Sequence, residues 1–180
     1  MKRLEALLII LTLISLIGVW ADNQALRLTF SISSILLALM YFPFGYFSLR
    51  SKDGKSLWLI LIGLTLFFAV LSPIYKLLFL PGWFKMVNIG LYSSAIGLIL
   101  VLLIRKFDMI IGSTKILKTR AIIWLVITLL MFIIPQTNYI AFAFKEYPDL
   151  IENFEKYQEN PSDSVTAKAF FKEFSEFHAK

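Results

Sequence analysis

Few side chains in this sequence could carry chemistry, and most of them lie near the ends of apolar segments. Lys76 follows a charge-free run of 20 residues. An ionisable residue in a membrane segment is a candidate functional group by default, but a lysine at a helix end can also extend its ammonium to the lipid headgroups. Gln136 and Asn138 follow Pro135 within another apolar segment, where they could line a polar cavity or hydrogen-bond to neighbouring helices.

The residues needed for the common catalytic and metal sites are missing. The chain has no cysteine, which excludes disulfides, thiolate metal sites and cysteine nucleophiles. His178 is the only histidine, so it has no second histidine ligand and no partner for a catalytic triad. The sequence also lacks a glycine-rich phosphate loop, an HExxH motif and a pair of intramembrane aspartates. We therefore predict no catalytic residue, no cofactor, no metal site and no enzymatic activity.

The composition is that of a membrane protein. Of the 180 residues, 58% are hydrophobic and 17% are charged, whereas soluble domains have about 45–50% and 25%. Five intervals without charge have lengths of 16, 22, 20, 19 and 24 residues, and a bilayer core needs about 20 helical residues. The sequence therefore predicts an all-α, polytopic membrane helical bundle. Its five transmembrane helices are expected at about 4–21, 28–49, 56–79, 84–104 and 121–143.

The first apolar segment has a second interpretation. Lys2 and Arg3, the apolar run after them and the end at Val19-Trp20-Ala21 resemble a signal peptide cleaved after Ala21. Cleavage would leave four transmembrane helices. Glu5 among the first basic residues and the bulky Trp20 beside the cleavage site favour a structural helix.

Basic residues predict how the chain is threaded. The segments before the first span, between the second and third, and between the fourth and fifth carry ten Lys and Arg, whereas the other connections carry three, Arg27, Lys76 and Lys85. Basic residues near span ends stay in the cytoplasm, so the N-terminus is expected inside and the C-terminal tail outside. These clusters suit anionic lipid headgroups, and we expect the lipid bilayer and no nucleic acid as a partner.

Two local patterns concern the way the spans meet. Pro81-Gly82 predicts a tight turn in which glycine takes a positive φ, with Trp83 at the outer interface. Gly90, Ser94 and Gly97 share one helical face, and small residues at this spacing let helices approach closely in lipid. The same face could pack within the bundle or join copies into a homo-oligomer. The loop 105–120 mixes basic and apolar residues and is expected along the cytoplasmic surface.

The tail, residues 145–180, differs from the transmembrane domain, residues 1–144. Its eight Asp and Glu exceed its five Lys and Arg. Tyr147-Pro148-Asp149 predicts one helix start, and Asn160-Pro161-Ser162-Asp163 predicts a second with Asn160 as its cap. We expect two short amphipathic helices that fold against each other, lie on the outer leaflet or dock on a membrane-protein partner.

A resemblance adds to these predictions. Ile74-Tyr75-Lys76 through Pro81-Gly82-Trp83, followed by Met86 and Ile89-Gly90-Leu91, resembles a recurring pattern in small multi-pass membrane proteins of Bacteroidota. It is also distantly similar to the N-terminal hairpin of the gliding-motility protein GldL. The resemblance implies a bacterial cytoplasmic (inner) membrane protein. This sequence departs from the pattern at Leu80, where tryptophan is usual, and its five charge-free intervals lack the intramembrane acidic residue on which the GldL motor depends.

Two functions remain open at this point. The absence of catalytic groups, together with small-residue faces and an aromatic tail, favours a non-enzymatic scaffold or accessory subunit. The alternative is a small transporter or channel near the outer membrane face, in which Lys76, Gln136 and Asn138 surround one cavity.

Overall fold

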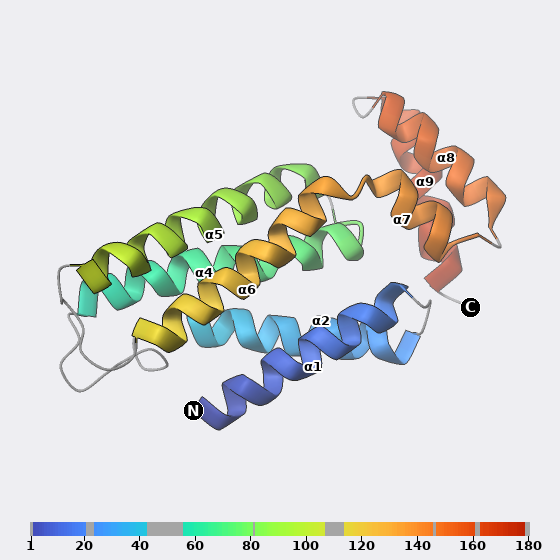
Figure 1. Ribbon diagram of the computed structural model, residues 1–180. Coiled ribbons are helices and arrows are strands. Elements are labelled where there is room, and N and C mark those ends of the chain that lie inside the picture. The colour runs from blue at the N-terminus through green and yellow to red at the C-terminus, as the bar shows by residue number, and fades with distance from the viewer. Residues whose placement is uncertain are drawn as a thin grey trace. The chain divides into compact units, whose positions relative to one another are not determined.

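The computed structural model describes residues 2–20, 24–42, 56–80, 82–106, 114–145, 147–160 and 163–178. Within these ranges the chain forms eight helices and no strands (Figure 1). The helices are α1 (Lys2–Trp20), α2 (Gln24–Tyr41), α4 (Ser56–Leu77), α5 (Trp83–Lys106), α6 (Thr114–Ile133), α7 (Gln136–Ala143), α8 (Pro148–Glu159) and α9 (Ser164–His178). The expected all-α fold class is confirmed.

The helices form two compact units. The first contains α1, α2, α4, α5 and α6 up to Ile133, and the second begins at Ile134 and contains α7, α8 and α9. In the first unit α4 packs against α2, α5 and α6, and α5 also packs against α6. The helix α4 is therefore the centre of this bundle. Its fully buried apolar side chains include Leu59, Ile62, Leu66, Ala69 and Val70.

Among the described residues, three helices are long and apolar enough to cross a membrane. These segments are Trp58–Leu77, Trp83–Ile104 and Ile116–Ile133. At 1.5 Å per residue each measures roughly 27–33 Å, which matches a hydrocarbon core of about 30 Å. Three is fewer than the five expected. The helix α2 offers a shorter apolar segment, Ala25–Tyr41, and the rest of its expected span lies outside the described residues.

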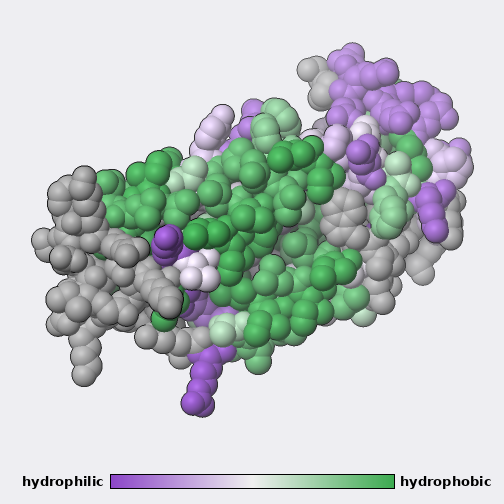
Figure 2. Space-filling view, in the orientation of Figure 1, coloured by the Kyte–Doolittle hydropathy of each residue, from purple (hydrophilic) through white to green (hydrophobic). Residues whose placement is uncertain are grey.

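The bundle has apolar side chains on its outside as well as in its core. Large exposed examples on α5 and α6 are Tyr92, Ile96, Ile99, Val126, Leu130 and Ile133. Figure 2 shows hydrophobic residues over much of the visible face of these helices. Soluble monomers rarely expose apolar patches of this extent, whereas helices surrounded by lipid do so as a rule.

Small residues bring α4 and α5 close together. A Cβ atom on Gly90 would lie 2.2 Å from Cβ of Ser72, and one on Gly97 would lie 2.6 Å from Oγ1 of Thr65. Ser94 contacts α6 instead, with its Oγ 2.9 Å from Oγ1 of Thr128. The face of α5 that carries Gly90, Ser94 and Gly97 is therefore occupied by contacts within the bundle.

The connection between α4 and α5 is a tight turn, as the sequence predicts. The amide of Leu80 donates to the carbonyl of Tyr75 at 3.0 Å, and Phe79 between them has a φ of 53°. Glycine usually occupies this left-handed position because a Cβ atom there is strained. Gly82 has a φ of 78°, which confirms its expected role, while Pro81 lies outside the described residues.

The fifth expected span, 121–143, is divided in the structure. The helix α6 begins earlier, at Thr114, and ends at Ile133, and α7 begins only at Gln136. Pro135 lies between them with φ −60° and ψ 147°, which is an extended conformation. Proline has no amide to continue the helix and disfavours helical geometry in the preceding residue, so the helix stops here.

The second unit confirms two short amphipathic tail helices, and they fold against each other. Phe170 of α9 lies 5.2 Å from Phe154 and 5.7 Å from Tyr157 of α8, measured between ring centroids. Pro148 begins α8 as expected, but the cap of α9 differs from the prediction. Asp163 accepts the amide of Val165 at 2.9 Å, and Asn160 instead ends α8. A cap accepts from an amide two or three residues later, and Asn160 is too distant for that.

Candidate functional site

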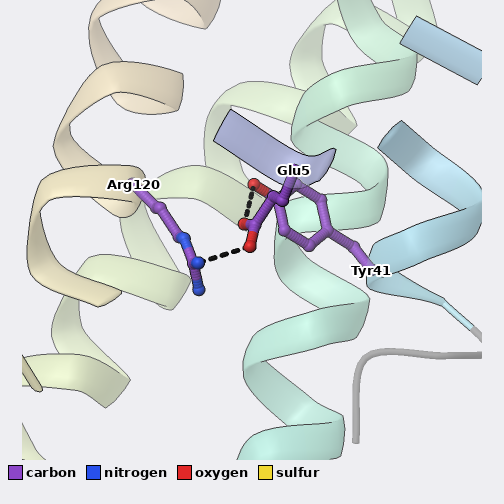
Figure 3. A network of polar contacts seen from close by, with 3 residues as sticks. All are labelled: Glu5, Tyr41 and Arg120. Atoms are coloured by element: carbon purple, nitrogen blue, oxygen red, sulfur yellow. Dashed lines mark hydrogen bonds and ion pairs between the residues drawn. The ribbon is translucent and has the colours of Figure 1, made fainter. Parts of the chain in front are cut away.

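A buried polar network joins three helices of the first unit (Figure 3). Glu5 comes from the first turns of α1, Tyr41 is the last residue of α2, and Arg120 lies in the second turn of α6. The Tyr41 hydroxyl donates to Oε1 of Glu5 at 3.0 Å, and the Arg120 guanidinium donates to Oε2 of the same carboxylate. Glu5 and Tyr41 are each 1% exposed and Arg120 is 9% exposed. We call these three residues the Glu5 cluster.

The Glu5 cluster satisfies a charge that would otherwise be costly to bury. One carboxylate oxygen binds a cation and the other binds a neutral hydroxyl. Removing one partner of a buried ion pair typically costs about 3–5 kcal/mol, because the other charge stays in a medium of low dielectric constant. The cluster therefore couples the positions of α1, α2 and α6.

The Glu5 cluster was not predicted, and the loop expected over 105–120 is shorter than predicted. The helix α6 begins at Thr114 and brings Arg120 into the helical bundle. In the sequence, Glu5 stands out only as an acidic residue beside two basic ones. One signal was present: Glu5 and Arg120 each directly precede a charge-free interval, and their charges are opposite.

Lys76 forms a second buried site, where α4 ends. Its side chain is buried, with 3% exposure, and its ammonium donates to the backbone carbonyl of Met131 in α6. The same ammonium lies 5.8 Å from the centre of the Trp83 ring, within the range of a cation–π interaction. Lys76 is directed into the bundle, where it contacts α6. We call Lys76, Trp83 and the Met131 carbonyl the Lys76 site.

Pro135 explains why the Met131 carbonyl is open to a lysine. In a continuous helix the amide of residue 135 would donate to the carbonyl of residue 131. Proline has no amide hydrogen, so this carbonyl lacks its helical donor. The ammonium of Lys76 takes the place of that donor. An exposed carbonyl in lipid costs several kcal/mol, which accounts for the burial of a charged side chain here.

The Lys76 site and the Glu5 cluster lie near opposite ends of α6. Arg120 and Met131 are separated by 11 residues of the helix, or about 16 Å along its axis. Between them Thr128 binds Ser94 of α5, and Trp124 is buried with 1% exposure. One face of α6 therefore presents a polar or amphipathic group at nearly every turn.

Gln136 and Asn138 do not form a joint site. Both belong to α7, where Gln136 is 1% exposed and Asn138 is exposed. Two residues apart on a helix, their side chains leave the axis in different directions, so they do not line one surface. The structure thus separates two of the three residues expected around a cavity.

The remaining titratable residues offer no metal site. Among the described residues no group of three or more His, Cys, Asp or Glu could hold a metal ion. On the exposed side of α8, Lys156 donates to Glu152 at 2.6 Å and lowers the pKa of that carboxyl. Asn153 donates to Glu173 at 2.7 Å and joins α8 to α9.

Known proteins give no further guide to this chain. No family model, curated protein or solved structure matches it. The resemblance to membrane proteins of Bacteroidota therefore stays a prediction, and the Glu5 cluster and the Lys76 site are the features that bear on function.

Proposed function

We propose that this chain is a multi-pass protein of the bacterial cytoplasmic membrane that acts as a non-enzymatic scaffold or accessory subunit. The observation that carries the proposal is the binding of buried polar side chains to groups on other helices. Glu5 binds Tyr41 and Arg120, Lys76 binds the Met131 carbonyl, and Ser94 binds Thr128. Polar groups engaged in this way fix helices in place rather than present reactive atoms to a substrate.

The proposed protein crosses the membrane five times, with α1 and α2 completing the three longer spans. Contacts in the Glu5 cluster bring together the start of α1, the end of α2 and the start of α6, as alternating crossings require. The ten basic residues counted above flank these same ends, so we assign this end of the bundle to the cytoplasm. The Lys76 site is then near the outer face, and the tail is extracytoplasmic.

The helix α1 is proposed to stay in the mature protein. Its Glu5 carboxylate is the partner of Arg120, and Gly18 lies so near Leu26 that a Cβ atom would come within 2.1 Å of it. Thr12 also donates to Ser33 of α2 at 3.0 Å. Cleavage after Ala21 would remove all of these contacts. Intact-mass measurement of the purified protein tests this point, and loss of residues 1–21 would contradict it.

The scaffold proposal is tested by comparing assembly with transport. We expect native mass spectrometry of the tagged protein, released from its own membranes in lipid nanodiscs, to show a second membrane protein in a fixed ratio. We also expect purified protein in liposomes to leave proton, sodium and chloride gradients unchanged. A protein found only as a single copy or as its own oligomer would contradict the scaffold proposal, and so would ion flux that exceeds that of empty liposomes.

Transport is the second candidate, because ionisable side chains are buried in helices of the bundle. Intramembrane charges often mark ion or substrate paths, and the chain has Glu5 and Arg120 at one end and Lys76 at the other. The residues expected to share this role, Gln136 and Asn138, do not line one surface. Flux abolished by Lys76→Met and by Arg120→Gln, in variants that fold, would favour transport over scaffolding.

A further inference from the structure

The α6–α7 break contains an unusual exchange of hydrogen-bond donors. Pro135 removes the amide that would reach the carbonyl of Met131, and a side chain from another helix supplies the replacement. The replacement is a cation buried to 3% exposure, although a polar uncharged residue at a helix end would satisfy one carbonyl as well. Lys76 therefore does more than fill a gap in a helix, because it attaches the last turn of α6 to the end of α4.

We propose that Lys76 and Pro135 form a latch. With the Lys76 ammonium bound to the Met131 carbonyl, the last turn of α6 and the first turn of α7 are ordered. When the ammonium leaves, that carbonyl has neither a helical amide nor a side-chain donor, and the turns beside the break lose their order. Trp83, the first residue of α5, supports the bound state, because the centre of its ring lies 5.8 Å from the ammonium.

The latch predicts thermodynamic coupling between Lys76 and Pro135, which are 59 positions apart in the sequence. Lys76 is needed because residue 135 is proline. Replacing Pro135 by alanine restores an amide that can reach the Met131 carbonyl, so Lys76 becomes dispensable for the order of the break. Interactions that share a partner give non-additive double-mutant cycles, whereas independent sites give additive ones.

The experiment uses the absence of native cysteine. A nitroxide on Asn138→Cys, an exposed position of α7, reports local motion by electron paramagnetic resonance in lipid nanodiscs. Hydrogen exchange of the amides at 131–134 and 136–138 reports the same region. We expect slow label motion in the parent chain and fast motion in Lys76→Met, with exchange about tenfold faster, as for the loss of one hydrogen bond to a charged group.

Three further variants decide the proposal. Lys76→Arg keeps a cationic donor and should retain the slow motion. Lys145→Met, which removes an exposed lysine near the break, should change nothing. In the Pro135→Ala background, Lys76→Met should leave the label slow.

Several outcomes would overturn the latch. These are fast label motion in the parent chain, unchanged motion in Lys76→Met, or an equal increase with and without Pro135→Ala. If Lys76→Met does not fold, Pro135→Ala alone gives the decision. Slow exchange of the amide at residue 135 would show that this amide reaches the Met131 carbonyl, as the latch requires. Rapid exchange of the same amide would contradict the latch.

Discussion

The hydroxyl of Tyr41 donates to the carboxylate of Glu5 at 3.0 Å, so the last residue of α2 is bound to the first turns of α1. The other oxygen of that carboxylate accepts from Arg120 of α6. One carboxylate thus holds three helix ends together. Substitutions of Arg120 and of Tyr41 measure how much each of the two contacts of this carboxylate contributes to stability.

Arg120 and Glu5 should behave as a coupled pair. Arg120→Met leaves the Glu5 carboxylate buried without its cation, and we expect a loss of about 3–5 kcal/mol in the free energy of unfolding. The double variant Glu5→Leu with Arg120→Met removes both charges and should lose less than Arg120→Met alone. Unfolding in mixed micelles with a denaturing detergent measures both. Additive effects of the two substitutions would show that the ion pair does not stabilise the bundle.

Tyr41→Phe should have a smaller effect than loss of Arg120. It removes one hydrogen bond to a charged acceptor, which typically contributes about 1.5–3 kcal/mol, and keeps the ring that fills the core. Tyr92→Phe is the matched control, because Tyr92 is 65% exposed. Equal unfolding free energies for the two variants would contradict the hydrogen bond of Tyr41.

Gly90→Ala should destabilise the contact between α4 and α5. The new Cβ atom would lie 2.2 Å from Cβ of Ser72, and overpacking of this kind costs about 1–3 kcal/mol. Ser72→Gly in the same chain removes the colliding atoms and should restore part of the loss. Ala95→Leu, at a partly exposed position of α5, should be milder than Gly97→Leu. Melting temperatures in detergent compare all four, and a failure of Ser72→Gly to compensate would locate the strain elsewhere.

Phe170→Ala should unfold much of the tail. Phe170 is 1% exposed and contacts Phe154 and Tyr157, and loss of a buried phenylalanine costs about 3–5 kcal/mol. Val165→Ala on the same helix is the control, since Val165 is 71% exposed. Limited proteolysis should cut the first variant faster within 147–178. Equal digestion of both would mean that the aromatic cluster does not hold α8 and α9 together.

Single cysteines should report the proposed threading. Ser164→Cys in the tail should react with an impermeant maleimide in intact spheroplasts, whereas Ser51→Cys and Ser113→Cys should react only after lysis. The chain has no native cysteine to interfere. Reaction of Ser51→Cys from outside would invert the topology.

The apolar helices could be predicted from the sequence because the pattern that indicates each one lies within its own segment. Runs without charge predicted helices long enough for a membrane, and glycine at position 82 predicted a positive φ that the structure has. Pro135 also marks the division of the fifth span locally, because proline interrupts a helix wherever it falls inside an apolar run. Signals carried by one segment need no knowledge of its neighbours.

The polar sites could not be predicted in the same way, because each depends on contacts between helices that are far apart in the sequence. Glu5 and Arg120 are 115 positions apart, and Lys76 and Met131 are 55 apart. Local spacing could not show that a lysine at the end of α4 would meet a carbonyl vacated by proline in α6. The carbonyl itself was predictable from Pro135, but its partner was a matter of tertiary packing.

The distance in sequence between Glu5 and Arg120 also sets the order in which the contacts of Glu5 can form during synthesis. At about 5–20 residues per second, the ribosome adds the intervening 115 residues in roughly 6–23 s. Tyr41 follows Glu5 by only 36 residues and is the earlier partner for its carboxylate. A nascent chain that stops before α6 has therefore not yet formed the contact between Glu5 and Arg120. Such a product lacks the ion pair that joins α1 to α6 in the finished protein.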